Sequence, residues 1–146
     1  VLPMTAGDQK ETFQELVEQT LGDDCSYEMV RTIYDNLNEM LEEQKEEPEP
    51  LKLEKNDVKR LLEQSEVTNE KLEEFDSHYE ETAGENASFM ASNVVNSRKF
   101  EIKTPDIVIQ VNPERTDLVE TREIDGKKCL VIELNDEVEV NGISIR

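Results

Sequence analysis

The sequence predicts an α+β protein, in which about four helices in the first part pack with an antiparallel β-meander of four to five strands in the last third. Apolar residues recur every three or four positions in the first part, the spacing of a helix with one buried face. From Lys99 onward the apolar period changes to two, the period of a strand. Asp125-Gly126 and Asn141-Gly142 each lie between two such runs, and these pairs indicate hairpins because a type I′ turn needs positive φ at both central positions. The helices are expected to cover one face of the sheet.

The first two helices are defined by caps and apolar stripes. The first is expected to open at Asp8, because Asp8-Gln9-Lys10-Glu11 has the spacing of a capping box. It is expected to end at Gly22, since glycine readily adopts the left-handed conformation of helix ends. Ser26 is expected to cap the second helix. The apolar stripes are Phe13, Leu16, Val17 and Leu21 in the first helix, and Val30, Ile33, Tyr34, Leu37, Met40 and Leu41 in the second.

Pro48-Glu49-Pro50 follows the second helix and predicts an extended linker at residues 46–51, because proline disfavours helix in the residue before it. A short third helix is expected near Asn56, and a fourth is expected to run from a cap at Thr68 to Gly84. Residues 87–96 fit either a helix or a strand. The residues expected to face inward are Val58, Leu61 and Leu62 in the third helix, and Leu72, Phe75 and Tyr79 in the fourth.

The strands are expected in residues 97–146. The first run begins at Lys99 and is interrupted by Thr104-Pro105, and the second covers residues 107–111. A loop over residues 112–117 follows. The two predicted hairpins then cover residues 118–134 and 138–145.

The net charge of −20 is unevenly distributed along the chain. Residues 1–96 hold 8 Lys and Arg against 25 Asp and Glu, a net charge of −17, whereas residues 97–146 hold 8 against 11, a net charge of −3. We therefore expect an acidic helical region at residues 1–96 and an antiparallel β region at residues 97–146, with the question of one shared core left open. A field of this sign repels nucleic-acid phosphates and anionic lipids, which argues against both as partners.

Three segments resemble a bacterial family, domain-of-unknown-function family 4317. They are residues 3–13 (PMTAGDQKETF), 47–51 (EPEPL) and 103–122 (KTPDIVIQVNPERTDLVETR), and the resemblance covers nearly the whole chain. Members of that family look like longer cytoplasmic proteins, of which this chain would be the C-terminal part. Val1 in place of an initiator Met agrees with that expectation. The resemblance implies no activity, ligand or catalytic residue.

The cysteine and apolar patterns predict a cytoplasmic location. Cys25 and Cys129 are too few for a disulfide framework and lack the paired spacing of zinc ligands. The sequence shows no export signal, and no apolar run approaches the roughly 18 residues that a membrane-spanning helix needs.

The residue types that most often perform catalysis give no candidate centre. His78 is the only histidine and lies among acidic residues, where it is expected to be a surface or boundary side chain. Cys25 follows Asp23-Asp24, whose carboxylates disfavour the reactive thiolate, and Cys129 is expected to be a small core residue of a strand. We predict no catalytic residue and lean against an enzyme.

The sequence also predicts no metal and no cofactor site. Asp23-Asp24 and Asn135-Asp136-Glu137 place acids near loops, but neither follows the pattern of a Ca²⁺ loop. Five glycines form no phosphate-binding loop. The helix pair near residues 56–84 has the outline of a helix-turn-helix, but its second helix is acidic and would repel DNA.

One loop is a weak candidate for recognition. Asn112, Glu114, Arg115 and Asp117 combine donors and acceptors between two strands, and such loops often bind partners. The alternative is that these residues simply build turns with local hydrogen bonds.

Three functional hypotheses remain. The first is a non-catalytic interaction or structural module of a longer cytoplasmic protein, with a protein partner. The second is an acidic mimic of a polyanion that binds a basic protein. The third is an enzyme whose active site is shared with a missing N-terminal part, in which acids such as Asp106 or Glu114 would take part.

Overall fold

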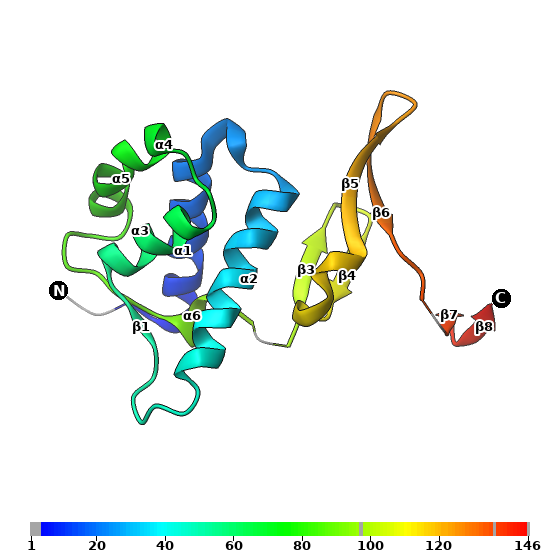
Figure 1. Ribbon diagram of the computed structural model, residues 1–146, viewed down its shortest axis with the longest axis horizontal. Helices are drawn as coiled ribbons and strands as arrows, with labels where there is room; N and C mark the ends of the chain where they lie inside the picture. Colours follow the sequence, from blue (N-terminus) through cyan, green and yellow to red (C-terminus); the bar gives the residue numbers. More distant parts are fainter. Residues whose placement is uncertain (1–3, 97, 136, 146) are drawn as a thin grey trace.

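A computed structural model describes residues 4–96, 98–135 and 137–145. It confirms the α+β class, with helices in the N-terminal part and small antiparallel sheets in the C-terminal part (Figure 1). The helices form one layered body, and the strands lie beyond the second helix.

Helix α1 (Ala6–Leu21) begins one turn earlier than the sequence predicted. Thr5, not Asp8, is the N-cap: its hydroxyl accepts a hydrogen bond from the Asp8 backbone amide at 3.1 Å, and the Asp8 carboxylate accepts one from the Thr5 amide at 3.4 Å. Asp8 thus supplies the second half of a capping box, a role that an acidic side chain three residues into the helix performs as readily as it caps. The predicted end is confirmed, since Gly22 has φ +52°.

Helix α2 (Tyr27–Gln44) begins as predicted. The Ser26 hydroxyl accepts from the Met29 amide at 3.2 Å, and a short 3₁₀ turn (Gly22–Asp24) joins α1 to this cap. Ile33 and Leu37 are fully buried, so α2 packs against the rest of the helical body through the face that its apolar spacing predicted.

The ambiguous segment near residue 90 contains both a strand and a helix. Strand β2 (Phe89–Met90) pairs antiparallel with β1 (Lys52–Leu53), and α6 (Ala91–Val94) follows directly. Leu53 and Phe89 face each other in this register and are both fully buried. The predicted linker at 46–51 therefore joins two parts of one core.

The remaining helices are α3 (Lys55–Gln64), α4 (Asn69–Glu73) and α5 (Phe75–Thr82). Helix α3 confirms the predicted third helix, and the Thr68 hydroxyl caps α4 as expected, accepting from the Lys71 amide. The expected single fourth helix is wrong, because the backbone at Glu74 (φ −94°, ψ −1°) ends α4 and starts α5.

The hydrophobic core lies entirely in the helical part. Three aromatic rings form its centre: Phe89 makes edge-to-face contacts with Phe13 at 5.8 Å and with Tyr79 at 6.0 Å between ring centroids. The buried cluster consists of Phe13, Leu16, Val17, Leu21, Ile33, Leu37, Leu53, Val58, Leu61, Leu62, Val67, Leu72, Phe75, Tyr79, Phe89, Ala91 and Val94. Among the described residues of the β part, Val119 is the one buried apolar side chain, and it lies outside this cluster.

The β part differs from the predicted single meander. Its strands form three separate antiparallel hairpins among the described residues: β3 (Phe100–Lys103) with β4 (Val108–Val111), β5 (Val119–Ile124) with β6 (Lys127–Ile132), and β7 (Val138–Val140) with β8 (Ile143–Ile145). A 3₁₀ segment (Pro113–Leu118) redirects the chain between β4 and β5, so these strands do not pair.

Both predicted turns are confirmed. Asp125 and Gly126 have φ +50° and +76°, and Asn141 and Gly142 have φ +52° and +81°. These are the positive angles that a two-residue hairpin turn requires.

Candidate interaction surface

The β part is joined to the helices through Thr116, in the 3₁₀ segment that follows β4. Its side chain is 4% exposed, although the residues on either side of it are exposed. Its hydroxyl accepts from Arg31 Nε at 3.1 Å and donates to the Asp35 carboxylate at 3.1 Å, and its carbonyl accepts from the Tyr27 hydroxyl at 3.3 Å. Arg31 and Asp35 also form an ion pair at 3.4 Å, so three α2 side chains converge on one threonine.

Two further contacts hold the same face of α2 against the strands. The Glu28 carboxylate accepts hydrogen bonds from the backbone amide and the hydroxyl of Thr121 on β5, and these bonds lower the pKa of Glu28. The Phe100 ring of β3 makes edge-to-face contacts with Tyr27 and Tyr34 of α2 at 6.1 and 6.2 Å. Helix α2 is therefore a platform with the core on one side and the strands on the other.

Exposed apolar side chains are concentrated in the β part. Among the residues that the structure describes, the large apolar side chains with the greatest exposure lie between residues 107 and 145, and two of them, Leu134 and Ile143, are 66% and 69% exposed. The full set is Ile107, Val108, Ile124, Ile132, Leu134, Val140, Ile143 and Ile145. These side chains are distributed over the three hairpins of the β part and the segments beside them, and exposed apolar side chains are candidates for contact with a partner.

The two edges of the β5–β6 hairpin are in different surroundings. Strand β5 lies against α2, and its Thr121 amide is occupied by Glu28. Strand β6 lies on the side of the hairpin away from α2 (Figure 1). Its edge therefore faces outward.

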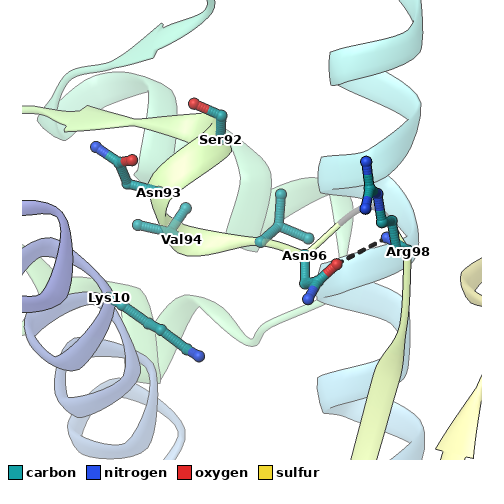
Figure 2. A pocket seen from close by; sticks show the side chains of 7 residues that line it. Lys10, Ser92, Asn93, Val94, Asn96 and Arg98 are labelled. Carbon is teal, nitrogen blue, oxygen red and sulfur yellow. Dashed lines mark hydrogen bonds between the residues drawn. The ribbon is translucent and has the colours of Figure 1, made fainter.

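Two adjoining grooves lie between the helical body and β3. The smaller, of about 310 Å³, is lined by α1, α6 and the segment before β3 (Figure 2). In it the Lys10 side chain extends toward Asn96, whose side-chain oxygen accepts from the Arg98 backbone amide at 2.8 Å. The larger groove, of about 690 Å³, continues past Tyr34 to Lys99 and Lys103. Both are shallow and mixed in character, and both are lined by amide, ammonium and apolar side chains.

His78 and Cys25 are apart from each other. His78 Nε2 lies 3.7 Å from a Glu74 carboxylate oxygen one turn earlier, in the acidic surroundings that the sequence indicated. Cys25 is exposed, and partial desolvation and the Glu18 carboxylate raise the pKa of its thiol. The direction agrees with the sequence argument, but the causes are desolvation first and then Glu18 on α1, and not the adjacent Asp23-Asp24.

Cys129 is not the core residue that was expected. It lies on β6 as predicted, but every residue of β6 is partly or fully exposed, the Cys129 thiol included. The difference follows from the separate hairpins, which leave the strands outside the core.

The loop at residues 112–117 forms local hydrogen bonds. The Asn112 side chain accepts from the Glu114 amide at 2.9 Å, and Arg115 Nε lies 3.2 Å from Asp117, which lowers the pKa of the Asp117 carboxyl. The local hydrogen bonds are those that the turn interpretation expected. The residue that matters most in this loop, Thr116, was not a candidate, because an uncharged residue between charged ones gives no signal of burial.

No group of three or more His, Cys, Asp or Glu side chains gathers in a metal-binding arrangement among the described residues, which exclude Asp136 of the acidic segment 135–137. Among the helices of the described chain, none is long and apolar enough to cross a membrane.

Comparison with models of known protein families identifies the family of this chain. The model of a family described as a domain of unknown function (DUF4317) matches residues 1–143. The comparisons with curated proteins and with solved structures gave no match. The match covers nearly the whole chain, so the family's domain is not confined to a part of it. The expectation that the chain belongs to a longer bacterial protein stays a prediction. The chain belongs to the DUF4317 family.

Proposed function

Starting from this family membership, we propose that the chain is a non-catalytic interaction module whose β part docks a protein partner. One observation supports the proposal above the others: within the described ranges, the most exposed large apolar side chains lie between residues 107 and 145, outside the helical core. Burying such side chains stabilises a complex by roughly 25 cal/mol for each Å² of apolar surface removed from water.

The helical part acts as the scaffold in this proposal. Its core is formed by fully buried side chains such as Phe13 and Phe89, which pack within the helical part itself. The Thr116 anchor and the Glu28–Thr121 contact hold the 3₁₀ segment and strand β5 against α2 in a defined position. A docking surface held in one position loses less conformational entropy on binding than a free segment.

The experiment compares two variants with the same change in net charge. Leu134→Lys with Ile143→Lys places two positive charges in the exposed apolar surface, and both sites are already open to water, so folding is retained. Glu42→Gln with Glu43→Gln removes two negative charges from exposed positions of α2. Affinity capture from cell lysate should retain the same partner on the wild-type chain and on the α2 variant, and lose it on the apolar-surface variant.

The reverse pattern would refute this proposal. A partner lost with Glu42→Gln and Glu43→Gln but kept with Leu134→Lys and Ile143→Lys would bind the acidic surface. Equal capture by all three proteins would place the docking site on neither surface.

The polyanion mimic is the second candidate, and one observation favours it. All Asp and Glu residues from 1 to 96 are exposed except Asp35 and Asp57, which are partly buried, so the charge of −17 faces solvent. A mimic predicts binding that DNA displaces and that weakens steeply with salt, since exposed charges are screened within about 10 Å at 0.1 M. A cytoplasmic location and the lack of a nucleic-acid partner belong to both proposals.

A further inference from the structure

The outer edge of β6 has unpaired backbone groups at alternate residues. Leu118 and Glu133 are a hydrogen-bonded pair of the hairpin, because the Glu133 amide donates to the Leu118 carbonyl at 2.8 Å. Bonded and non-bonded pairs alternate in an antiparallel ladder, so the pairs of the other parity turn their amides and carbonyls outward. On β6 these are Lys128, Leu130 and Ile132, opposite Glu123, Thr121 and Val119.

The Thr121 contact supports this assignment independently. Thr121 is opposite Leu130, and its amide donates outward to Glu28 of α2. The outward groups of β5 thus meet the helix, whereas those of β6 face away from it (Figure 1).

A two-stranded hairpin is at best marginally stable by itself, and a third strand with an apolar face is the usual requirement. The β5–β6 hairpin has apolar side chains for such a face. Leu130 is partly buried and Ile132 is 43% exposed, both on the face that carries the buried Val119. An added strand at the β6 edge would extend this face.

The charge pattern of β6 identifies the added strand as a second β6. When two copies pair antiparallel about a two-fold axis, the bonding pattern allows registers that centre on Leu130 or on one of its neighbours. With Leu130 on the axis, Lys127 lies opposite Glu133 of the second copy, and the same pair recurs at the other end. Shifting the axis to Cys129 or Val131 places an uncharged residue opposite Lys127 instead.

Strand β6 also lies in the part of the chain with the lower net charge, which favours pairing with a second copy there. Two chains of net charge −20 repel each other, and the repulsion is weakest where the charge is lowest. Residues 97–146 carry −3 of the total and the helical residues carry −17. The β6 edge lies in the former region, on the side away from α2 (Figure 1).

We propose that two copies of the chain associate through their β6 strands, forming a four-stranded antiparallel sheet in the order β5-β6-β6-β5 with Leu130 on the two-fold axis. This inference rests on the proposed function, since both take the β part as a docking surface. Lys127 and Glu133 set the register, and backbone hydrogen bonds at Lys128, Leu130 and Ile132 supply the pairing. Because one short strand from each copy makes the pairing, we expect a small, transient interface.

Charge reversal tests the partner and the register together. In Lys127→Glu, a glutamate faces Glu133 of the second copy at both ends of the strand, and like charges directly opposite are destabilising. Sedimentation over concentrations of roughly 1 µM to 1 mM, the range of weak complexes, should show a wild-type dimer whose dissociation constant rises roughly tenfold in this variant. Both residues are exposed, so folding is retained.

The double variant Lys127→Glu with Glu133→Lys restores opposite charges across the axis and should return the dissociation constant to within about threefold of wild type. The reversal starts with Lys127 because Glu133 also attracts Arg115 of its own chain. A chain that is monomeric at every concentration, or a double variant no tighter than Lys127→Glu, overturns the proposal.

Cross-linking tests the register by itself. With Leu130 on the axis, Cys129 lies opposite Val131 of the second copy in a non-bonded pair, where the Cα atoms are about 4.5 Å apart, within the range that a disulfide spans. In a Cys25→Ser background, Val131→Cys should give a disulfide-linked dimer on oxidation, and Cys129 alone should give far less. Efficient linkage through Cys129 alone would centre the sheet on Cys129 and overturn this register.

The dimer proposal and the proposed function can be refuted independently of each other. A monomeric chain whose captured partner is still lost with Leu134→Lys and Ile143→Lys, two positions outside β6, retains the proposed function and loses the dimer. A dimer that responds to charge reversal, with capture unaffected by those two substitutions, retains the dimer and refutes the docking of a different protein there.

Discussion

Thr116→Val is the substitution that best tests how the β part is held. Valine has nearly the shape of threonine, so the site stays filled, but the two side-chain hydrogen bonds to Arg31 and Asp35 are lost. Arg31 and Asp35 remain paired with each other at 3.4 Å, so neither charge is left alone. The change therefore isolates the hydroxyl of one residue that joins the two parts of the molecule.

The expected cost follows from these contacts. A hydrogen bond to a charged group contributes about 1.5–3 kcal/mol when buried, and a neutral one about 0.5–1.5 kcal/mol. The Arg31 and Asp35 side chains are 32% and 36% exposed, so we take about 1 kcal/mol for each bond. The docking of the β part on α2 should weaken by about 2 kcal/mol, or roughly 30-fold in the undocking equilibrium.

Amide hydrogen exchange measures this equilibrium locally. The Thr121 amide donates to Glu28 across the junction and to no strand, so it is exposed whenever the β part undocks. In Thr116→Val its exchange should accelerate roughly 30-fold, while the buried Ile33 of the helical core keeps its wild-type rate. Thr116→Ser, which keeps the hydroxyl and loses one methyl group, should have a much smaller effect of about 0.8 kcal/mol. Equal acceleration at Thr121 and Ile33, or no difference between the valine and serine variants, would refute the anchor.

Three further outcomes are expected. Phe89→Ala removes a fully buried ring from the aromatic centre and should lower the free energy of unfolding by about 3–5 kcal/mol in urea titration, whereas Ile143→Ala at an exposed site should cost less than about 0.5 kcal/mol. The pKa of Glu28 is lowered by its hydrogen bonds to Thr121, so the stability that this contact gives is fully present above the ordinary value of 4.5 and is lost as the pH falls through the lowered folded value. The protection of the Thr121 amide, measured against its intrinsic exchange rate at each pH, should fall over that range and should show no such response in Glu28→Gln. Gly126→Ala meets no atom within 4 Å, yet φ +76° is costly for alanine, so exchange at Lys127 should rise by the equivalent of about 1–2 kcal/mol while Ile33 is unchanged.

The helical half could be predicted well because its signals are local. Ser26 and Thr68 cap the helices that were expected to begin there. Helix α1 ends at Gly22 as expected, because a residue without a side chain readily adopts the positive φ found there. The errors also have local causes. Asp8 fits two positions of a capping box, and nothing in residues 69–82 marks the break at Glu74.

The β half shows where such prediction stops. Asp125-Gly126 and Asn141-Gly142 gave both hairpins correctly, since a two-residue turn determines which strands it joins. The pairing of one hairpin with the next has no comparable local signal. The alternating side chains of β6 indicate that the strand has two faces, but not whether other elements pack on either face. Cys129 was for that reason predicted to be a core residue, although the hairpin lies outside the core.

By itself, the sequence determined the succession of a helical part and a β part, the two hairpin turns and the concentration of negative charge in residues 1–96, because each depends on neighbouring residues or on composition. Only the tertiary structure decided that residues before and after the 46–51 segment share one core, that Thr116 holds the strands against α2, and that the apolar side chains of the strands face water. The contacts behind these features join residues that are distant in the sequence, as Leu53 pairs with Phe89 and Arg31 donates to Thr116. The energy of such contacts has no counterpart in the local pattern of either segment.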